Sequence, residues 1–168
     1  TFGYDSSQQP IINDLSVSFS RGWTGIVGPN GAGKTTFLHL ACGMLKPQKG
    51  TILRNEIPHY CCQRTDTSPE SFEEFIWDYS SDASILKGIL RIENDWLERW
   101  STLSHGERKR AQLGVALWKS PDIVAFDEPT NHIDSETREM LLNALRRYEG
   151  TGLLVSHDRD LLDDLCEN

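Results

Sequence analysis

The stretch from Gly28 to Thr35 constrains this chain more than any other, because its letters GPNGAGKT fit the pattern G-x-x-x-x-G-K-[ST] at every specified position. Glycines at this spacing let the backbone curl so that successive N–H groups point at phosphate oxygens. A helix that opens after such a loop adds further N–H groups and a positive dipole end. A short buried strand is expected over Gly25 to Val27 and an apolar helix over Thr36 to Cys42. The motif therefore predicts a phosphate-binding turn, and a Gly-rich turn without a ligand is the weaker alternative.

The side chains of the loop suit a nucleoside triphosphate and its metal ion. Lys34 supplies a point charge for the β- and γ-phosphates, and the Thr35 hydroxyl can hold Mg²⁺. The residues expected to contact the nucleotide from this loop are Gly28, Asn30, Gly31, Ala32, Gly33, Lys34, Thr35 and Thr36.

Length, composition and charge narrow the class of protein. With 168 residues, of which 38% are hydrophobic, the chain is one domain, or one domain with a small lobe. It contains neither a signal peptide nor an apolar run near the ~20 residues that span a bilayer. A net charge of −8 argues against direct nucleic-acid binding by this segment. The four cysteines have no zinc spacing, which indicates reduced thiols in a cytoplasmic protein.

Apolar periodicity predicts alternating strands and helices, and hence an α/β fold of the P-loop NTPase kind. We expect a mainly parallel sheet flanked by helices, with a small antiparallel edge. Residues 64–102, with helical spacing from Ser71 to Trp100, are expected to form a short helical lobe inserted into a core of 1–63 and 103–168. Expected strands lie at Ile11 to Phe19, Thr51 to Leu53, Ile57 to Cys62, Asp122 to Phe126 and Leu153 to Val155, and expected helices at Lys34 to Gly43, Ser104 to Trp118, Asp134 to Tyr148 and Asp158 to Leu165.

Two carboxylates close the most apolar of these strands, in the run Ile123 to Glu128 (IVAFDE). Ligands collect at the carboxyl ends of buried parallel strands. Asp127 is therefore expected to hold Mg²⁺ through water, and Glu128 to orient the water that attacks the γ-phosphorus. Taken alone, the pair could be a strand that meets a turn; beside the phosphate loop, we favour the functional interpretation.

With these motifs, the chain resembles the ATP-binding cassette (ABC) ATPases over nearly its whole length, from Phe2 to Asp160. The segment Leu103 to Glu107 (LSHGE) resembles the signature segment of that superfamily. The same pattern of Ser and Glu three residues apart also predicts a capping box at a helix start. Gln63 falls at the family's glutamine loop, and Asp134 resembles the aspartate of its D-loop. His157 resembles the switch histidine, and Tyr4 lies about where the family has an aromatic that stacks on adenine. Phe2 is a substitute for the aromatic.

The resemblance implies that the chain binds ATP with Mg²⁺ and hydrolyses ATP to ADP and phosphate. Thr35, Gln63 and Asp127 would hold the metal, and Glu128, Gln63 and His157 would act on the attacking water and the γ-phosphate. Ser104 and Gly106 would close over a nucleotide held by a second cassette, fused in tandem or in a homodimer. His105 stands where the family most often has glycine, and its effect on the closed state is left open.

Two segments resemble the ABC-F group in particular: Glu128 to Asp134 (EPTNHID) and Ser156 to Arg159 (SHDR). ABC-F proteins carry two cassettes in one polypeptide, and many act on the ribosome, so ribosome contacts would come from segments outside this chain. The stretch Arg64 to Thr102 is short and has no long charged helical arm, which is typical of a second cassette or of a member without the arm. The family's usual tail after His157 is expected to be shortened or absent. Two alternatives remain: the motor subunit of a membrane transporter, bound to separate membrane domains, and a nucleotide switch that hydrolyses poorly.

Overall fold

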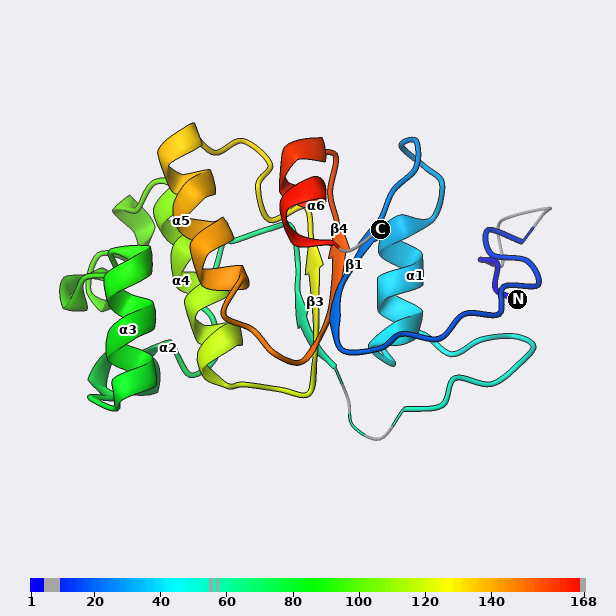
Figure 1. Cartoon of the computed structure of the whole chain (residues 1–168), viewed down its shortest axis with the longest axis horizontal. Coiled ribbons are helices and arrows are strands. Elements are labelled where there is room, and N and C mark those ends of the chain that lie inside the picture. Colours follow the sequence, from blue (N-terminus) through cyan, green and yellow to red (C-terminus); the bar gives the residue numbers. More distant parts are fainter. Residues whose placement is uncertain (5–9, 55, 57, 167–168) are drawn as a thin grey trace.

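The computed structural model describes residues 1–4, 10–54, 56 and 58–166 and has an α/β architecture (Figure 1). In chain order, the elements are β1 (Gly22–Ile26), α1 (Lys34–Ala41), β2 (His59–Cys61), α2 (Phe72–Trp77), α3 (Ser81–Leu90), the 3-10 helices η1 (Asn94–Leu97) and η2 (Trp100–Thr102), α4 (His105–Trp118), β3 (Ile123–Asp127), α5 (Ser135–Leu145), β4 (Thr151–Val155) and α6 (Arg159–Leu165).

The four strands form one sheet in the order β1-β4-β3-β2, and every pairing in it is parallel. Ile26 pairs with Val155, and Asp127 also pairs with Val155 from the other side. The carboxyl ends of β1, β4 and β3 therefore lie side by side at one edge. This confirms the predicted parallel sheet and places the phosphate loop, which follows β1, next to the acidic end of β3.

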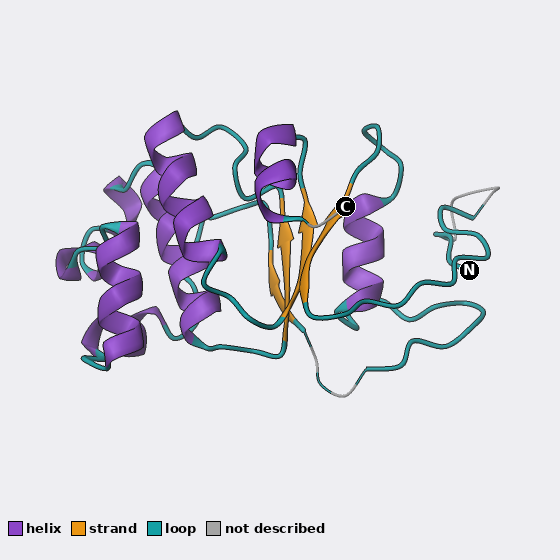
Figure 2. Ribbon diagram, in the orientation of Figure 1, coloured by secondary structure: helices purple, strands orange, loops and turns teal. Residues whose placement is uncertain are grey.

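Helices cover both faces of the sheet (Figure 2). Side chains of neighbouring strand residues point to opposite faces, so Phe126 and Leu154 pack in the cluster shared with α4, α5 and α6. Ala125 and Leu153 pack on the other face against Leu38 of α1. The alternation explains why β3 and β4 have almost continuous apolar sequences, as buried parallel strands do.

α2 and α3 form a layer beyond α4 and α5, at the left of Figure 1. α3 contacts both α4 and α5, and α2 contacts α4 and η1. Phe75 and Trp96 are fully buried there, in the same apolar cluster as Phe126 of β3. The helical segment and the sheet thus share one core.

Three strand predictions were wrong or only partly right. Ile11 to Phe19 forms no strand; it makes a single antiparallel bridge between Ile12 and Phe2, which is all that the described residues show of the expected antiparallel edge. Leu15 and Val17 are more than half exposed, because no neighbouring strand buries one face of their alternating pattern. Thr51 to Leu53 is also irregular, and of the segment Ile57 to Cys62 only His59–Cys61 is a strand, with Ile57 outside the described residues.

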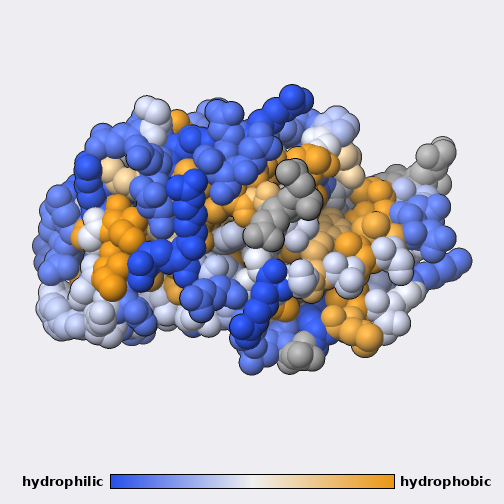
Figure 3. Space-filling view, in the orientation of Figure 1, coloured by the Kyte–Doolittle hydropathy of each residue, from blue (hydrophilic) through white to orange (hydrophobic). Residues whose placement is uncertain are grey.

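Smaller differences concern ends and burial. Val27, expected in a buried strand, lies beyond the end of β1 and is 70% exposed. The helix predicted to run to Tyr148 ends at Leu145. In the described part of the chain, no helix is long and apolar enough to cross a membrane. The face in Figure 3 is largely hydrophilic, with apolar areas over α3 and around α1.

Candidate nucleotide site

The phosphate loop adopts the backbone that its glycines allow. Gly31 and Gly33 have φ of 82° and 90°, in the left-handed region that favours glycine. Gly33 caps the N-terminus of α1 with no side-chain hydrogen bond, so the first turn of α1 is open to an anion. A Cβ on Gly33 would lie 2.5 Å from Cγ2 of Ile11, which shows how closely residue 11 approaches the loop.

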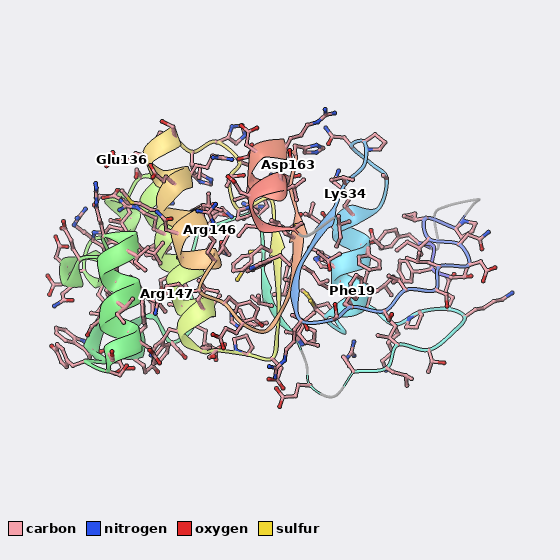
Figure 4. All side chains as sticks on the ribbon, viewed as in Figure 1. Phe19, Lys34, Glu136, Arg146, Arg147 and Asp163 are labelled. Carbon is pink, nitrogen blue, oxygen red and sulfur yellow. The ribbon has the colours of Figure 1, made fainter. Side chains whose placement is uncertain are left out.

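Lys34 folds back over the loop at the start of α1 (Figure 4). Its Nζ donates to the carbonyl oxygens of Gly28 at 2.8 Å and Pro29 at 3.2 Å. The same nitrogen lies 3.4 Å from Nε2 of His157. The ammonium therefore sits between the loop and the residues that follow β4.

Asp127 ends β3 and is almost completely buried. Its Oδ2 accepts hydrogen bonds from the hydroxyls of Thr35, at 2.8 Å, and Tyr60, at 3.2 Å. Sequence reasoning predicted Asp127 and Thr35 as neighbours of one metal ion, but it missed Tyr60.

Glu128 turns sharply away from the strand, with φ of 51°. Its N–H donates to the Val155 carbonyl at 2.8 Å, and its Oε2 accepts from the His157 N–H at 3.2 Å. The other oxygen, Oε1, is buried; it lies 3.3 Å from His157 Nε2 but in a geometry that makes no hydrogen bond. A buried carboxylate oxygen without a hydrogen-bond donor is costly in a protein interior.

These side chains line a pocket of about 620 Å³ at the carboxyl edge of the sheet. The predicted site residues that it brings together are Asn30, Gly31, Gly33, Lys34, Thr35, Thr36, Gln63, Asp127, Glu128 and His157. The wall also includes Ile11, Asn131, His132 and Val155, which were not predicted as site residues. Asn131 and His132 could have been found from their place just after the acidic strand end, whereas nothing in the sequence singled out Ile11.

Five predicted residues do not line this pocket: Gly28, Ala32, Tyr4, Ser104 and Gly106. The Ala32 N–H donates to the Pro29 carbonyl at 3.2 Å, within the loop. Tyr4 is 42% exposed, and its hydroxyl lies 3.4 Å from that of Thr36. Tyr4 is thus near the start of α1 but outside the phosphate pocket.

The signature segment begins α4. Ser104 and Glu107 form the predicted capping box: the Ser104 hydroxyl accepts from the Glu107 N–H at 3.2 Å, and the Glu107 carboxylate accepts from the Ser104 N–H at 2.7 Å. A Cβ on Gly106 would lie 3.2 Å from the Thr137 hydroxyl of α5, so this glycine lets the two helices approach. Burial and the charge of Lys109 lower the pKa of His105, which favours a neutral imidazole.

One buried cation links α4 to the end of β2. Lys109 is 2% exposed, and burial lowers the pKa of its ammonium. Its Nζ donates to the Cys62 carbonyl at 3.1 Å and to Gln112 Oε1 at 3.2 Å. Gln63, the predicted glutamine-loop residue, follows Cys62 directly.

A model of the family described as ABC transporter matches residues 12–131, well over half of the chain. The chain belongs to the ABC transporter family. It is therefore a cassette of a nucleotide-binding ATPase family, as the motifs indicated. This ABC cassette is 34% identical to the ribosome protection protein VmlR of Bacillus subtilis over 96% of the chain and 28% of VmlR. It is also 32% identical to the energy-dependent translational throttle protein EttA of Mycobacterium tuberculosis, over 98% of the chain and 32% of EttA.

The ABC cassette spans between about a quarter and two fifths of the length of the curated relatives that it matches. Solved structures confirm the fold. The dimeric structure of MJ0796, a bacterial ABC transporter cassette, superposes with a TM-score of 0.76 at 21% identity, covering 96% of this chain and 87% of that one. A post-hydrolysis dimer of the same cassette, bound to ADP and Pi, gives 0.75 at 19% identity, over the same shares of each chain.

Proposed function

We propose that this cassette binds ATP with Mg²⁺ and hydrolyses it at a composite interface with a second cassette, in a cytoplasmic protein of the ABC-F type that acts on the ribosome. The proposal rests on where the predicted site residues lie, because only some of them line the pocket. The pocket gathers the phosphate loop, Gln63, Asp127, Glu128 and His157, while Ser104 and Gly106 at the head of α4 lie outside it.

The residues around the pocket fit a nucleotide with its metal ion. Mg²⁺ prefers oxygen ligands, and Thr35, Gln63 and Asp127 offer a hydroxyl, an amide and a carboxylate. Bound Mg²⁺ neutralises charge on the β- and γ-phosphate oxygens. Lys34 and the open first turn of α1 would bind the same phosphates from the other side. Tyr4, near Thr36, is the proposed stacking partner of the adenine.

Glu128 is the proposed residue for the hydrolytic water. Its Oε1 makes no hydrogen bond in the buried end of the pocket, whereas Oε2 is fixed by the His157 N–H. A water hydrogen-bonded to Oε1 would be oriented for attack, and Glu128 would withdraw its proton. His157, 3.4 Å from Lys34 Nζ and 3.1 Å from Asn30 Oδ1, would sense the γ-phosphate.

A second cassette would complete each site. Ser104 opens α4 with a helix N-terminus, a ready anion site. In this arrangement the N-terminus of one cassette would cover the nucleotide of the other, and two-fold or pseudo-two-fold symmetry would close the pair. The solved MJ0796 cassette, which shares the fold, is a dimer.

The ABC-F assignment rests on the relatives. Their names include a ribosome protection protein and a translational throttle protein, at 32% to 34% identity. The net charge of −8 on this cassette disfavours binding to the negatively charged RNA backbone. The ribosome contacts would therefore come from other parts of the protein. We also propose that residues 64–102 form a short helical lobe inserted into a core of 1–63 and 103–168, with α3 packed on α4 and α5 of that core.

The test uses the intact protein with Glu128→Gln, which keeps the shape of the side chain but removes the basic oxygen. We expect unchanged ATP binding, loss of ATP turnover by at least ~100-fold, and ATP-dependent retention on purified ribosomes in sucrose gradients. Glu139→Gln, on the exposed face of α5, is the matched control and should behave as wild type. Normal turnover by the Glu128 variant would refute its role, and retention on membranes instead of ribosomes would favour the transporter alternative.

A further inference from the structure

A tyrosine from β2 reaches the carboxylate that closes β3. The Tyr60 hydroxyl donates to Asp127 Oδ2 at 3.2 Å, beside the Thr35 hydroxyl, which donates to the same oxygen at 2.8 Å. β2 and β3 are parallel neighbours in which Tyr60 pairs with Ala125, so the sheet register brings the ring to this position. Three elements, α1, β2 and β3, thus meet at one oxygen atom.

A histidine lies behind the tyrosine. Nε2 of His39, on α1, is 3.2 Å from the Tyr60 hydroxyl, and the two rings meet edge to face at 5.0 Å. An ionised carboxylate only accepts hydrogen bonds, so the Tyr60 proton must point at Asp127. The phenol oxygen then accepts from His39, whose Nε2 carries the hydrogen. The chain of donors therefore runs in one direction, from His39 through Tyr60 to Asp127.

We propose that Tyr60 is a positioning residue for Asp127, and that His39 holds the Tyr60 hydroxyl in its donating orientation. Two donors on one oxygen fix the rotation of a carboxylate. The inference rests on the proposed Mg²⁺ role of Asp127. Outer-shell partners of this kind change metal affinity by about 10–100-fold.

The Tyr60 phenol is half-buried beside Asp127. Burial, followed by the nearby charge of Asp127, raises the pKa of Tyr60 above its usual value. The Thr35 hydroxyl can give its proton to Asp127 and would still have lone pairs for a metal ion. The Tyr60 hydroxyl adds a second donor to the same carboxylate oxygen.

The test measures how much Mg²⁺ strengthens ATP binding, by calorimetry on the intact protein with excess Mg²⁺ and with EDTA. We expect Tyr60→Phe to reduce this enhancement about tenfold and to leave ATP affinity in EDTA unchanged. It should also raise the Mg²⁺ concentration for half-maximal ATPase activity while changing kcat at saturating Mg²⁺ much less. Tyr148→Phe is the matched control, because it removes a phenol hydroxyl that donates to the Pro121 carbonyl at 2.6 Å, before the start of β3.

The outcomes separate the inference from the proposed function. If Mg²⁺ does not strengthen ATP binding to the wild type, the proposed metal site is wrong. If it does, and Tyr60→Phe retains the full enhancement, the positioning role is refuted. His39→Leu should shift the enhancement in the same direction as Tyr60→Phe, and His39→Gln, which keeps a donor, should restore it. A wild-type response from His39→Leu would remove His39 from the chain of donors.

Discussion

At the scale of single residues, Lys34 carries the largest expected effect on nucleotide binding. Its ammonium lies within 3.4 Å of the loop carbonyls and of His157, so truncation removes the main positive charge of the pocket. We expect Lys34→Ala to weaken ATP binding at least tenfold, since hydrogen bonds between charged groups contribute about 1.5–3 kcal/mol. Calorimetric titration checks this, with Lys46→Ala, in the loop after α1, as control. Equal affinities would argue against the phosphate cradle.

Asp158, next to His157, makes the stability depend on pH. It caps α6 and binds Arg138 of α5 through both oxygens, at 2.6 and 3.2 Å. Burial alone would raise the pKa of this carboxyl, but the Arg138 and Leu161 hydrogen bonds outweigh it, and the pKa falls below its usual 3.8. A lowered folded pKa stabilises the protein above the unfolded value, and this contribution disappears as the pH falls through the folded value.

We therefore expect Asp158→Asn, which keeps a capping side chain, to lose about 1 kcal/mol of unfolding free energy near pH 6. The difference from wild type should shrink as the pH drops below about 3.9. Denaturant melts at a series of pH values measure it. A difference that stays constant down to pH 2.5 would show that charge is not the cause.

At the scale of elements, β1 and β4 approach each other through Gly152. Trp23 pairs with Gly152, and a Cβ on that glycine would lie 2.2 Å from the Trp23 ring. The ring is also held by its Nε1–H, which donates to the Leu145 carbonyl at 3.1 Å. We expect Gly152→Ala to destabilise the fold by about 1–3 kcal/mol, as overpacking does.

Gly88 provides the control for this change. A Cβ on Gly88, in α3, meets open space, so Gly88→Ala should stabilise by about 0.5–1 kcal/mol through helix propensity. Thermal unfolding of both variants tests the pair of predictions. A neutral Gly152→Ala would mean that Trp23 can move aside.

Sequence patterns predicted correctly those helices and strands that have a strong local signal. They were wrong where a strand forms only if a neighbouring strand pairs with it. β3 and α4 were predicted nearly to their ends, because an apolar run and a capping box are local signals. The alternation from Ile11 to Phe19 predicted a strand, but alternation needs a partner strand to be stabilised. Tyr60 was missed for a similar reason: its contact with Asp127 spans 67 residues and depends on sheet register.

At the scale of the whole molecule, the prediction concerns pairing of cassettes. Ser104→Arg places a long cation at the head of α4, away from the pocket of its own chain. In the Glu128→Gln background it should abolish ATP-dependent pairing and leave ATP affinity of the single cassette unchanged. Ser104→Ala is the control for the lost cap, which costs about 1 kcal/mol. Analytical ultracentrifugation with ATP distinguishes these cases, and equal loss of binding and pairing would contradict a role across the interface.

The buried ammonium of Lys109 connects α4 to the residue that follows β2. It joins the chain immediately before Gln63 to the second turn of α4, the helix that Ser104 caps. We expect a shift of Gln63 toward a bound triphosphate to reach the head of α4 through this contact. In a pair of cassettes, this contact would couple nucleotide binding in one cassette to the position of its α4 at the site of the other.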